Sequence, residues 1–294
     1  MKELLTRIIV AAIGIPVAVF LIWKGGYYFM SIIAVVASIA LWEFYSIQRK
    51  NNFHANYVSG LSAGLAIILS SLLSANILIA WIVILLLLSL STMIYEMFKT
   101  NTHHSANISL TIAGVIYVSL SFTTLLLLRE FYTFYSTLPF SANMSGSSLQ
   151  ALVSNLNCAW FVLSIFGSVW ICDSAAYFTG KAIGKHKLFP RVSPKKTWEG
   201  ALGGLIGAVG TFVLMVHWLI PALPLIHALI PGLIVGTIGQ IGDLAESLIK
   251  RDTGVKDSSA ILPGHGGLLD RFDSILFASP AIFIYLVITL WLKF

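Results

Sequence analysis

Residues 77–95 read I-L-I-A-W-I-V-I-L-L-L-L-S-L-S-T-M-I-Y, a run without a charged side chain. A helix needs about 20 mostly apolar residues to cross the hydrocarbon core of a bilayer, so this run is predicted to be a transmembrane helix. Further segments of the same kind bring the expected spans to about nine, near 8–23, 27–47, 57–74, 77–95, 108–128, 156–178, 201–220, 223–241 and 272–292. The expected fold is an all-α, polytopic membrane bundle.

Composition supports a membrane protein. Of the 294 residues, 57% are hydrophobic and only 10% are charged, whereas an ordinary soluble domain carries about 25% charged residues. So few charges cannot cover a water-facing surface, which excludes a soluble enzyme, a disordered protein and a nucleic-acid-binding domain. Cys158 and Cys172 both lie in apolar stretches and offer no disulfide framework and no metal-ligand spacing.

The positions of the basic residues predict the orientation. With the N-terminus in the cytoplasm and nine alternating spans, only Lys24, Arg129 and Lys293 of the 18 Lys and Arg residues fall on the outer side. This asymmetry is what the positive-inside rule requires. The net charge of +6 therefore reflects cytoplasmic loops and not a nucleic-acid partner.

The acids divide the chain into two expected regions. Residues 1–155 read as about five plain spans, a scaffold for a dimer or for lipid access. Residues 156–294 read as about four spans with cytoplasmic loops at 179–200 and 242–271, and they hold eight of the twelve acids. Any chemistry is expected in this second, catalytic region, on its cytoplasmic side.

Asp173 lies at the end of the sixth expected span. A carboxylate there is costly unless it is paired, bound to metal or placed in a water-filled cavity. Asp173 is therefore read either as a paired, structural carboxylate or as a ligand in a cavity. The adjoining small residues Ser174, Ala175 and Ala176 would let another helix or a ligand approach closely.

The loop 179–200 is rich in basic residues. Ser193 followed by Pro194 is typical of a helix N-cap and first helical position, which would place Lys195 and Lys196 in the first helical turn. Lysines are unfavourable there by the helix dipole unless an anion also binds. The loop is thus read as an anion site or, alternatively, as an ordinary basic loop that touches lipid headgroups.

The stretch 242–273 carries the densest set of polar residues. Asp243, Glu246, Ser247 and Lys250 are spaced to share one helical face, and Asp270 and Asp273 are one turn apart. Mg²⁺ prefers carboxylate oxygens together with substrate phosphates. Acids from two helix ends, ringed by Lys and Arg, would hold Mg²⁺ and a polyphosphate together; the alternative is a salt-bridged loop that caps two helices.

Residues 247–273 read S-L-I-K-R-D-T-G-V-K-D-S-S-A-I-L-P-G-H-G-G-L-L-D-R-F-D. This resembles the signature of the phosphatidate cytidylyltransferases, or CDP-diacylglycerol synthases. The fixed positions of that signature are Ser247, Lys250, Arg251, Lys256, Asp257, His265, Gly266, Gly267, Asp270, Arg271 and Asp273. Residues 173–177 and 193–200 also look like family segments, so the resemblance covers about 170–274, whereas residues 1–155 match only in hydropathy.

The resemblance implies a reaction in which CTP and phosphatidic acid give CDP-diacylglycerol and pyrophosphate at the inner membrane of a bacterium. It also implies Mg²⁺, with a monovalent cation such as K⁺ beside it, and a homodimer. The metal-binding acids of the family carry over to Asp243 and Asp270, with Asp173 and Asp273 as further candidates. The expected catalytic cations are Lys250, Arg251, Lys256 and Arg271, and the expected substrate-binding residues are Ser193, Lys195, Lys196, Thr197, Glu199, Ser247, Asp257, His265, Gly266 and Gly267.

Two other functions remain open at this point. A CTP-dependent lipid kinase of the dolichol-kinase type would present similar groups to a nucleotide, but it would release CDP in place of pyrophosphate. A transporter would use Asp173 and Asp243 to couple ions to an anionic solute. Broken helices and inverted halves would favour the transporter, and no matching half is found.

Overall fold

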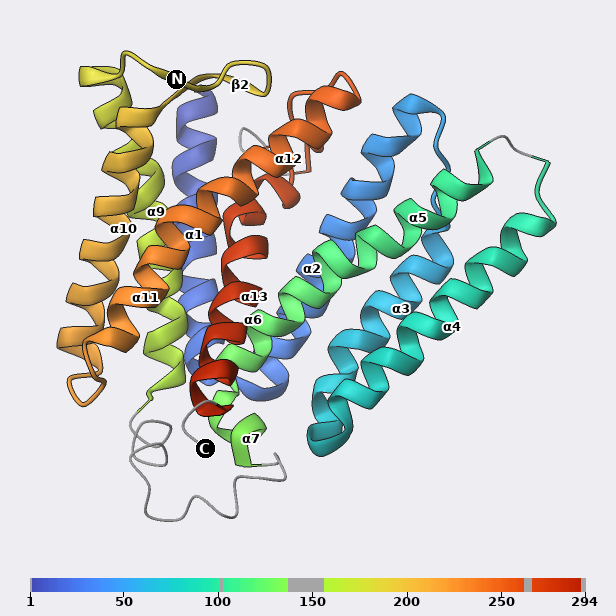
Figure 1. Cartoon of the computed structure of the whole chain (residues 1–294), viewed down its shortest axis with the longest axis horizontal. Coiled ribbons are helices and arrows are strands. Elements are labelled where there is room, and N and C mark those ends of the chain that lie inside the picture. The colour runs from blue at the N-terminus through green and yellow to red at the C-terminus, as the bar shows by residue number, and fades with distance from the viewer. Residues whose placement is uncertain (1, 101–102, 137–155, 262–265, 292–294) are drawn as a thin grey trace. The chain divides into compact units, whose positions relative to one another are not determined.

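The structure is a computed structural model that describes residues 2–100, 103–136, 156–261 and 266–291, and helices dominate it (Figure 1). In this part of the chain, seven helices are long and apolar enough to cross a membrane: 26–51, 77–97, 104–129, 158–183, 198–219, 226–252 and 269–290. The first and third expected spans correspond to shorter apolar helices, Gly14–Lys24 and Tyr57–Leu73. The all-α, multi-pass membrane fold is confirmed, and the count of nine and the cytoplasmic N-terminus stay predictions.

The chain forms two compact units. Unit 1 comprises Met1–Leu126 and Lys250–Phe272, and unit 2 comprises Leu127–Ile249 and Asp273–Phe294. The expected division at residue 155 stays a prediction. Unit 1 holds α1 (Lys2–Lys24), α2 (Gly26–Gln48), η1 (Arg49–Asn51), α3 (Tyr57–Leu69), η2 (Ser70–Asn76), α4 (Ile77–Met97), α5 (His104–Gly114), η3 (Val115–Leu120) and the start of α6 (Ser121–Arg129).

Unit 2 holds α7 (Phe131–Ser136), α9 (Cys158–Ile183), β1 (Lys187–Phe189), β2 (Ser193–Thr197), α10 (Trp198–Leu219), α11 (Ile226–Ile234) and η5 (Val235–Gly239). The boundaries between the units fall within α6, α12 (Gln240–Asp252) and α13 (Leu269–Trp291). Most of α12 and of α13 belongs to unit 2, and the segment that joins these two helices belongs to unit 1.

A buried tyrosine organises the helices of unit 1. Tyr45, on α2, is fully buried, and its hydroxyl donates a hydrogen bond to the Thr111 carbonyl oxygen of α5 at 2.7 Å. Gly60 of α3 and Gly114 of α5 face the ring, and a Cβ atom on either glycine would collide with it. Because these two glycines have no side chains, α3 and α5 can approach α2 closely.

Glycines also bring α9 and α10 together in unit 2. A Cβ atom on Gly204 would lie 3.0 Å from the Cys172 carbonyl oxygen, and one on Gly207 would lie 2.9 Å from the Ala175 Cβ. Small residues at such spacing are what close helix packing in membranes requires. Asp173 follows Cys172 directly on the helix that makes this contact.

A π-turn interrupts the helix that leads to the polar end of α12. α11, η5 and α12 form one continuous helix from Ile226 to Asp252, and the segment Val235–Gly239 is π-helical. Gly236 packs against α10, where its Cβ would lie 2.9 Å from Leu205 Cα. The Gln240 amide donates to the carbonyl oxygens of Gly236 at 2.6 Å and Ala201 at 3.0 Å, which supplies donors where the α-helical pattern is broken.

The basic loop after α9 folds as a hairpin, not as the start of a helix. β1 pairs with β2 in antiparallel register, with Lys187 opposite Thr197. The expectation that Ser193 caps the helix is wrong: Thr197 is the N-cap, and α10 begins at Trp198. Helix electrostatics explain the choice, because a cap at Thr197 places Glu199 in the first turn, whereas a cap at Ser193 would place Lys195 and Lys196 there against the dipole.

We expect Gly236→Ala to lower the thermal stability of the purified protein, because the added methyl group meets the backbone of Leu205 and overpacking costs about 1–3 kcal/mol. Gly210→Ala is the matched control: a Cβ there meets nothing within 4 Å, and alanine is the better helix former. Thermal unfolding in detergent should separate the two variants, and equal midpoints would contradict the packing argument.

Candidate active site

A cavity of about 400 Å³ opens within unit 2 where α9, the hairpin, α10 and α12 meet. Carboxylates and amines from separate elements line it together: Asp173 and Lys181 from α9, Lys195 and Lys196 from β2, and Asp243 from α12. Asp173 thus lines a cavity, and the choice between a structural carboxylate and a ligand stays a prediction. A pocket with this mixture of charges can accept a ligand that carries both negative groups and cations.

Lys196 and Asp243 form the central ion pair of the cavity. The Lys196 ammonium donates to Asp243 Oδ2 at 2.6 Å, and both side chains are 29% exposed. The Ser247 hydroxyl, one turn along α12, donates to Asp243 Oδ1 at 3.4 Å. Since both groups of the pair remain open to solvent, an entering cation or phosphate can compete for either one.

The hairpin is fastened to the start of α10 by side chains that the resemblance assigned to substrate. The Thr197 hydroxyl accepts a hydrogen bond from the Gly200 amide at 3.2 Å, and Glu199 accepts one from the His186 amide at 3.2 Å. The His186 ring nitrogen Nδ1 lies 2.7 Å from Glu199 Oε1. These contacts hold Lys195 and Lys196 over the cavity, and Thr197 itself lines it whereas Ser193 and Glu199 do not.

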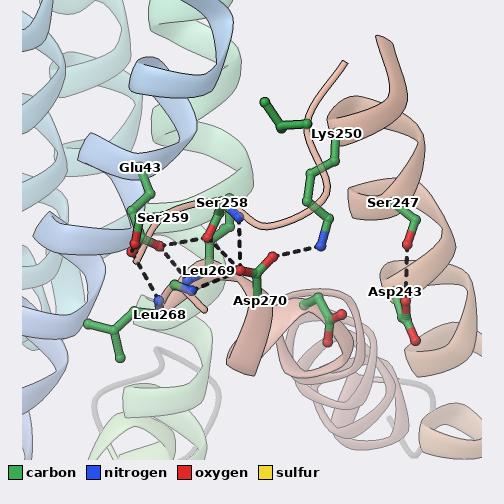
Figure 2. Close-up of polar contacts among 12 residues, drawn as sticks. Glu43, Asp243, Ser247, Lys250, Ser258, Ser259, Leu268, Leu269 and Asp270 are labelled. Atoms are coloured by element: carbon green, nitrogen blue, oxygen red, sulfur yellow. Dashed lines mark hydrogen bonds and ion pairs between the residues drawn. The ribbon is translucent and has the colours of Figure 1, made fainter. Parts of the chain in front are cut away.

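Asp270 occupies the first turn of α13 in unit 1 and accepts hydrogen bonds on both of its oxygens (Figure 2). The Lys250 ammonium donates to Oδ1 at 2.6 Å. The Ser258 amide, the Ser258 hydroxyl and the Gly267 amide lie 2.9, 2.9 and 2.8 Å from Oδ2. Lys250 and Asp270 have side chains only 10% and 7% exposed, so the charge pair is largely screened from water.

The two glycines before α13 are required by this geometry. Gly266 has a φ of +80°, a left-handed conformation that favours glycine. A Cβ on Gly267 would collide with the Ser258 hydroxyl. The glycines of the signature therefore serve the close approach of the chain to Asp270, and His265, with 262–264, lies outside the described residues.

The remaining predicted residues are at water-accessible positions or on the last helix. Arg251, Lys256, Asp257 and Arg271 are exposed, and Arg251 Nη1 donates to the Val255 carbonyl oxygen at 3.1 Å. Asp273 follows Asp270 by one turn on α13, as the spacing predicted, and accepts a hydrogen bond from the Ser274 amide.

The donor chemistry at Asp243 fits a divalent cation. Asp173 and Asp243 share the cavity, and Mg²⁺ is typically held by one or two carboxylates plus phosphate and water. The ion pair of the Lys196 ammonium with Asp243 shows that positive charge is favoured beside this carboxylate. Within the described residues, no group of three or more His, Cys, Asp or Glu side chains is arranged to hold a metal. The shared site of Asp243 and Asp270 joins residues of different units and stays a prediction.

Sequence reasoning missed Glu43. This residue lies on α2, in the region that was read as plain spans, and its side chain is fully buried. Its carboxylate accepts hydrogen bonds from Ser258, Ser259, Leu268 and Leu269 (Figure 2). The available signal was a single acid inside the apolar run 27–47, because an ionisable residue within a span is rarely without a role.

Comparison with known proteins gives matches over nearly the whole chain. The model of the Cytidylyltransferase family matches residues 5–289. The chain is 32% identical to a phosphatidate cytidylyltransferase of Synechocystis sp. over 292 residues, 97% of each protein. It is 31% identical to one of Bacillus subtilis over 300 residues, 99% of this chain and 100% of the relative. One of Haemophilus influenzae is 40% identical over 159 residues, 52% of this chain and 55% of the relative.

We expect Thr197→Val to destabilise unit 2 by about 1 kcal/mol, because loss of the capping hydroxyl leaves the Gly200 amide without its side-chain acceptor. Thr197→Ser retains that hydroxyl and is the matched control. The measurement is the midpoint of thermal or denaturant unfolding in detergent. A valine variant as stable as the serine variant would show that the cap contributes nothing measurable.

Proposed function

The chain belongs to the cytidylyltransferase family, and we propose that it carries out the reaction for which its relatives are named. CTP and phosphatidic acid react to give CDP-diacylglycerol and pyrophosphate, so the enzyme is a nucleotidyltransferase of phospholipid biosynthesis. A multi-pass membrane protein suits this task, because the lipid substrate remains in the bilayer while the nucleotide arrives from water. The bacterial inner membrane and its cytoplasmic side are the proposed location, since the basic residues mark that side.

The observation that carries the proposal is the cavity of unit 2. Three lysines, Lys181, Lys195 and Lys196, face the same cavity as two carboxylates, Asp173 and Asp243. Lysines suit a triphosphate as point charges, and carboxylates suit the cation that accompanies it. A cavity that served only to hold helices together would not need an open ion pair within it.

The chemistry requires positioning more than proton transfer. A phosphate oxygen of phosphatidic acid forms a bond to the α-phosphorus of CTP, the bond from that phosphorus to the oxygen bridging to the β-phosphate breaks, and pyrophosphate leaves with the bonding electrons. The attacking oxygen is already anionic at neutral pH. The obstacle is repulsion between two anions, so the catalytic contribution of the protein is charge neutralisation and alignment.

The basic residues divide this work between them. Lys195 and Lys196 bind the triphosphate, and Lys250, Arg251, Lys256 and Arg271 neutralise the remaining phosphates. α12 connects the two sets, since it carries Asp243 and Lys250 seven residues apart, or about two turns on one face. Ser247 and the Gly266–Gly267 backbone contribute hydrogen-bond donors.

The cytidylyltransferase family generally uses a divalent metal, and we propose Mg²⁺ at Asp243, with Asp173 beside it. Bound there, Mg²⁺ would neutralise phosphate charge and orient the α-phosphorus. Asp270 is proposed as a further ligand; its Oδ1 accepts a hydrogen bond from Lys250, and its Oδ2 accepts them from Ser258 and Gly267. Asp273 as a further ligand, a second, monovalent cation such as K⁺, and a homodimer complete the proposal.

Pyrophosphate release tests the reaction directly. Purified protein in detergent, given CTP, Mg²⁺ and phosphatidic acid, should release pyrophosphate, and omission of any one component should abolish release. Asp243→Asn should lose nearly all turnover without loss of the fold, whereas Asp252→Asn, the same change at an exposed position of the same helix, should keep it. Release of CDP would identify a lipid kinase, and normal turnover of Asp243→Asn would remove the metal assignment.

The role of the hairpin can be tested separately. Lys196→Ala should lower kcat/KM for CTP by about tenfold or more, because a hydrogen bond to a charged group contributes about 1.5–3 kcal/mol. Lys187→Ala removes an exposed lysine of the same hairpin that does not line the cavity and should leave kcat/KM near that of the unmodified enzyme. Equal values for the two variants at limiting CTP would argue against an anion site at Lys196.

A further inference from the structure

Glu43 links the α2 helix to a segment more than 200 positions later in the chain. Its Oε1 accepts hydrogen bonds from the Ser259 hydroxyl and, at 3.1 Å, from the Leu268 amide. Its Oε2 accepts them from the Leu269 amide at 2.7 Å and lies 3.2 Å from the Ser258 hydroxyl. We call the described residues 253–261 and 266–268 the α12–α13 connector.

The burial of Glu43 makes these contacts obligatory. Its side chain is 0% exposed, and a buried carboxylate is strongly destabilising unless hydrogen-bond donors replace its lost hydration. Two of its donors are the amides of Leu268 and Leu269 at the start of α13, where the helix dipole also favours a negative charge. The connector therefore supplies the donors that let a carboxylate stay buried at this position.

The same contacts fix Asp270. The Ser258 hydroxyl lies between the two carboxylates, 3.2 Å from Glu43 Oε2 and 2.9 Å from Asp270 Oδ2. Three consecutive backbone amides lead into α13. The Gly267 amide donates to Asp270, and the amides of Leu268 and Leu269 donate to Glu43. A Cβ on Gly267 would lie 2.7 Å from both Glu43 oxygens, so no side chain separates Glu43 from this backbone.

We propose that Glu43 is a positioning residue for the reaction. It holds the connector against α2 and thereby fixes the positions of Asp270 and Lys250, which the proposed reaction uses. Glu43 touches neither substrate nor metal itself. The inference rests on the proposed function, since Asp270 and Lys250 belong to the proposed catalytic machinery.

Glu43→Gln is the central variant. The amide retains one acceptor oxygen but turns an NH₂ group toward donors that need an acceptor. We expect kcat to fall about 10–100-fold, as misplacement by about 1 Å can do, with a smaller change in KM for CTP. Trypsin cleavage after Lys256, an exposed connector residue, should become faster in the folded protein.

Glu96→Gln is the matched control. Glu96 is a second buried carboxylate of unit 1, 4% exposed, and its contacts are to Asn107, His104 and Lys99, away from the connector. It should lose thermal stability to a comparable degree while kcat and the rate of trypsin cleavage after Lys256 stay near their original values. Equal losses of kcat in Glu43→Gln and Glu96→Gln would indicate a general effect on the fold and would overturn the proposal.

A double-mutant cycle with Ser258→Ala gives a second criterion. Because the Ser258 hydroxyl contacts Glu43 as well as Asp270, the two losses of activity should be less than additive in the combined variant, and fully additive losses would contradict a shared role. If Glu43→Gln does not fold, Ser259→Ala removes one donor to the same carboxylate and should give a smaller fall in kcat; an unchanged kcat there would overturn the proposal.

Loss of the proposed reaction and loss of the positioning role of Glu43 would give different experimental results. If the unmodified enzyme releases no pyrophosphate, the proposed function fails, and faster cleavage after Lys256 in Glu43→Gln than in Glu96→Gln still decides whether Glu43 holds the connector. If pyrophosphate is released but Glu43→Gln retains its full kcat while Asp243→Asn is inactive, the function stands and the positioning role is overturned.

Discussion

Negative charge placed among apolar helices has to be balanced by donors of the same chain, and this requirement governs the polar parts of the molecule. Glu43 and Asp270 accept hydrogen bonds from the connector and from the backbone amides at the start of α13. Asp243 is balanced by Lys196 from the hairpin. In each case a carboxylate contacts a segment between helices and contributes to its position.

The ion pairs Lys250–Asp270 and Lys196–Asp243 differ in how readily a ligand can displace them. Lys250 and Asp270 are nearly withdrawn from water, and the contacts around Asp270 are numerous, so this part behaves as a fixed frame. Lys196 and Asp243 are more open and face a cavity. In the proposed function, the enclosed carboxylate of Asp270 would serve alignment, and the more open pair of Lys196 and Asp243 would serve the entry of the nucleotide.

Local sequence was enough to predict the long apolar helices and the polar face of α12. Uncharged runs such as 77–95 can satisfy their backbone in a bilayer only as helices, and the spacing of Asp243 and Lys250 requires a helix to place them on one face. The hairpin was not predictable in this way, because a strand at 193–197 depends on a partner strand at 187–189. Glu43 was overlooked because its four donors lie more than 200 residues away, although its charge within an apolar run was visible.

The π-turn at Val235–Gly239 changes the direction in which the polar face of α12 points. One extra residue in a helical turn rotates everything downstream by about 100° relative to an uninterrupted α-helix. The glycine face of α11 and the carboxylate face of α12 therefore have a relative orientation that an uninterrupted α-helix would not give. A deletion of one residue at this point would turn Asp243 away from its present neighbours while leaving every functional side chain in the sequence.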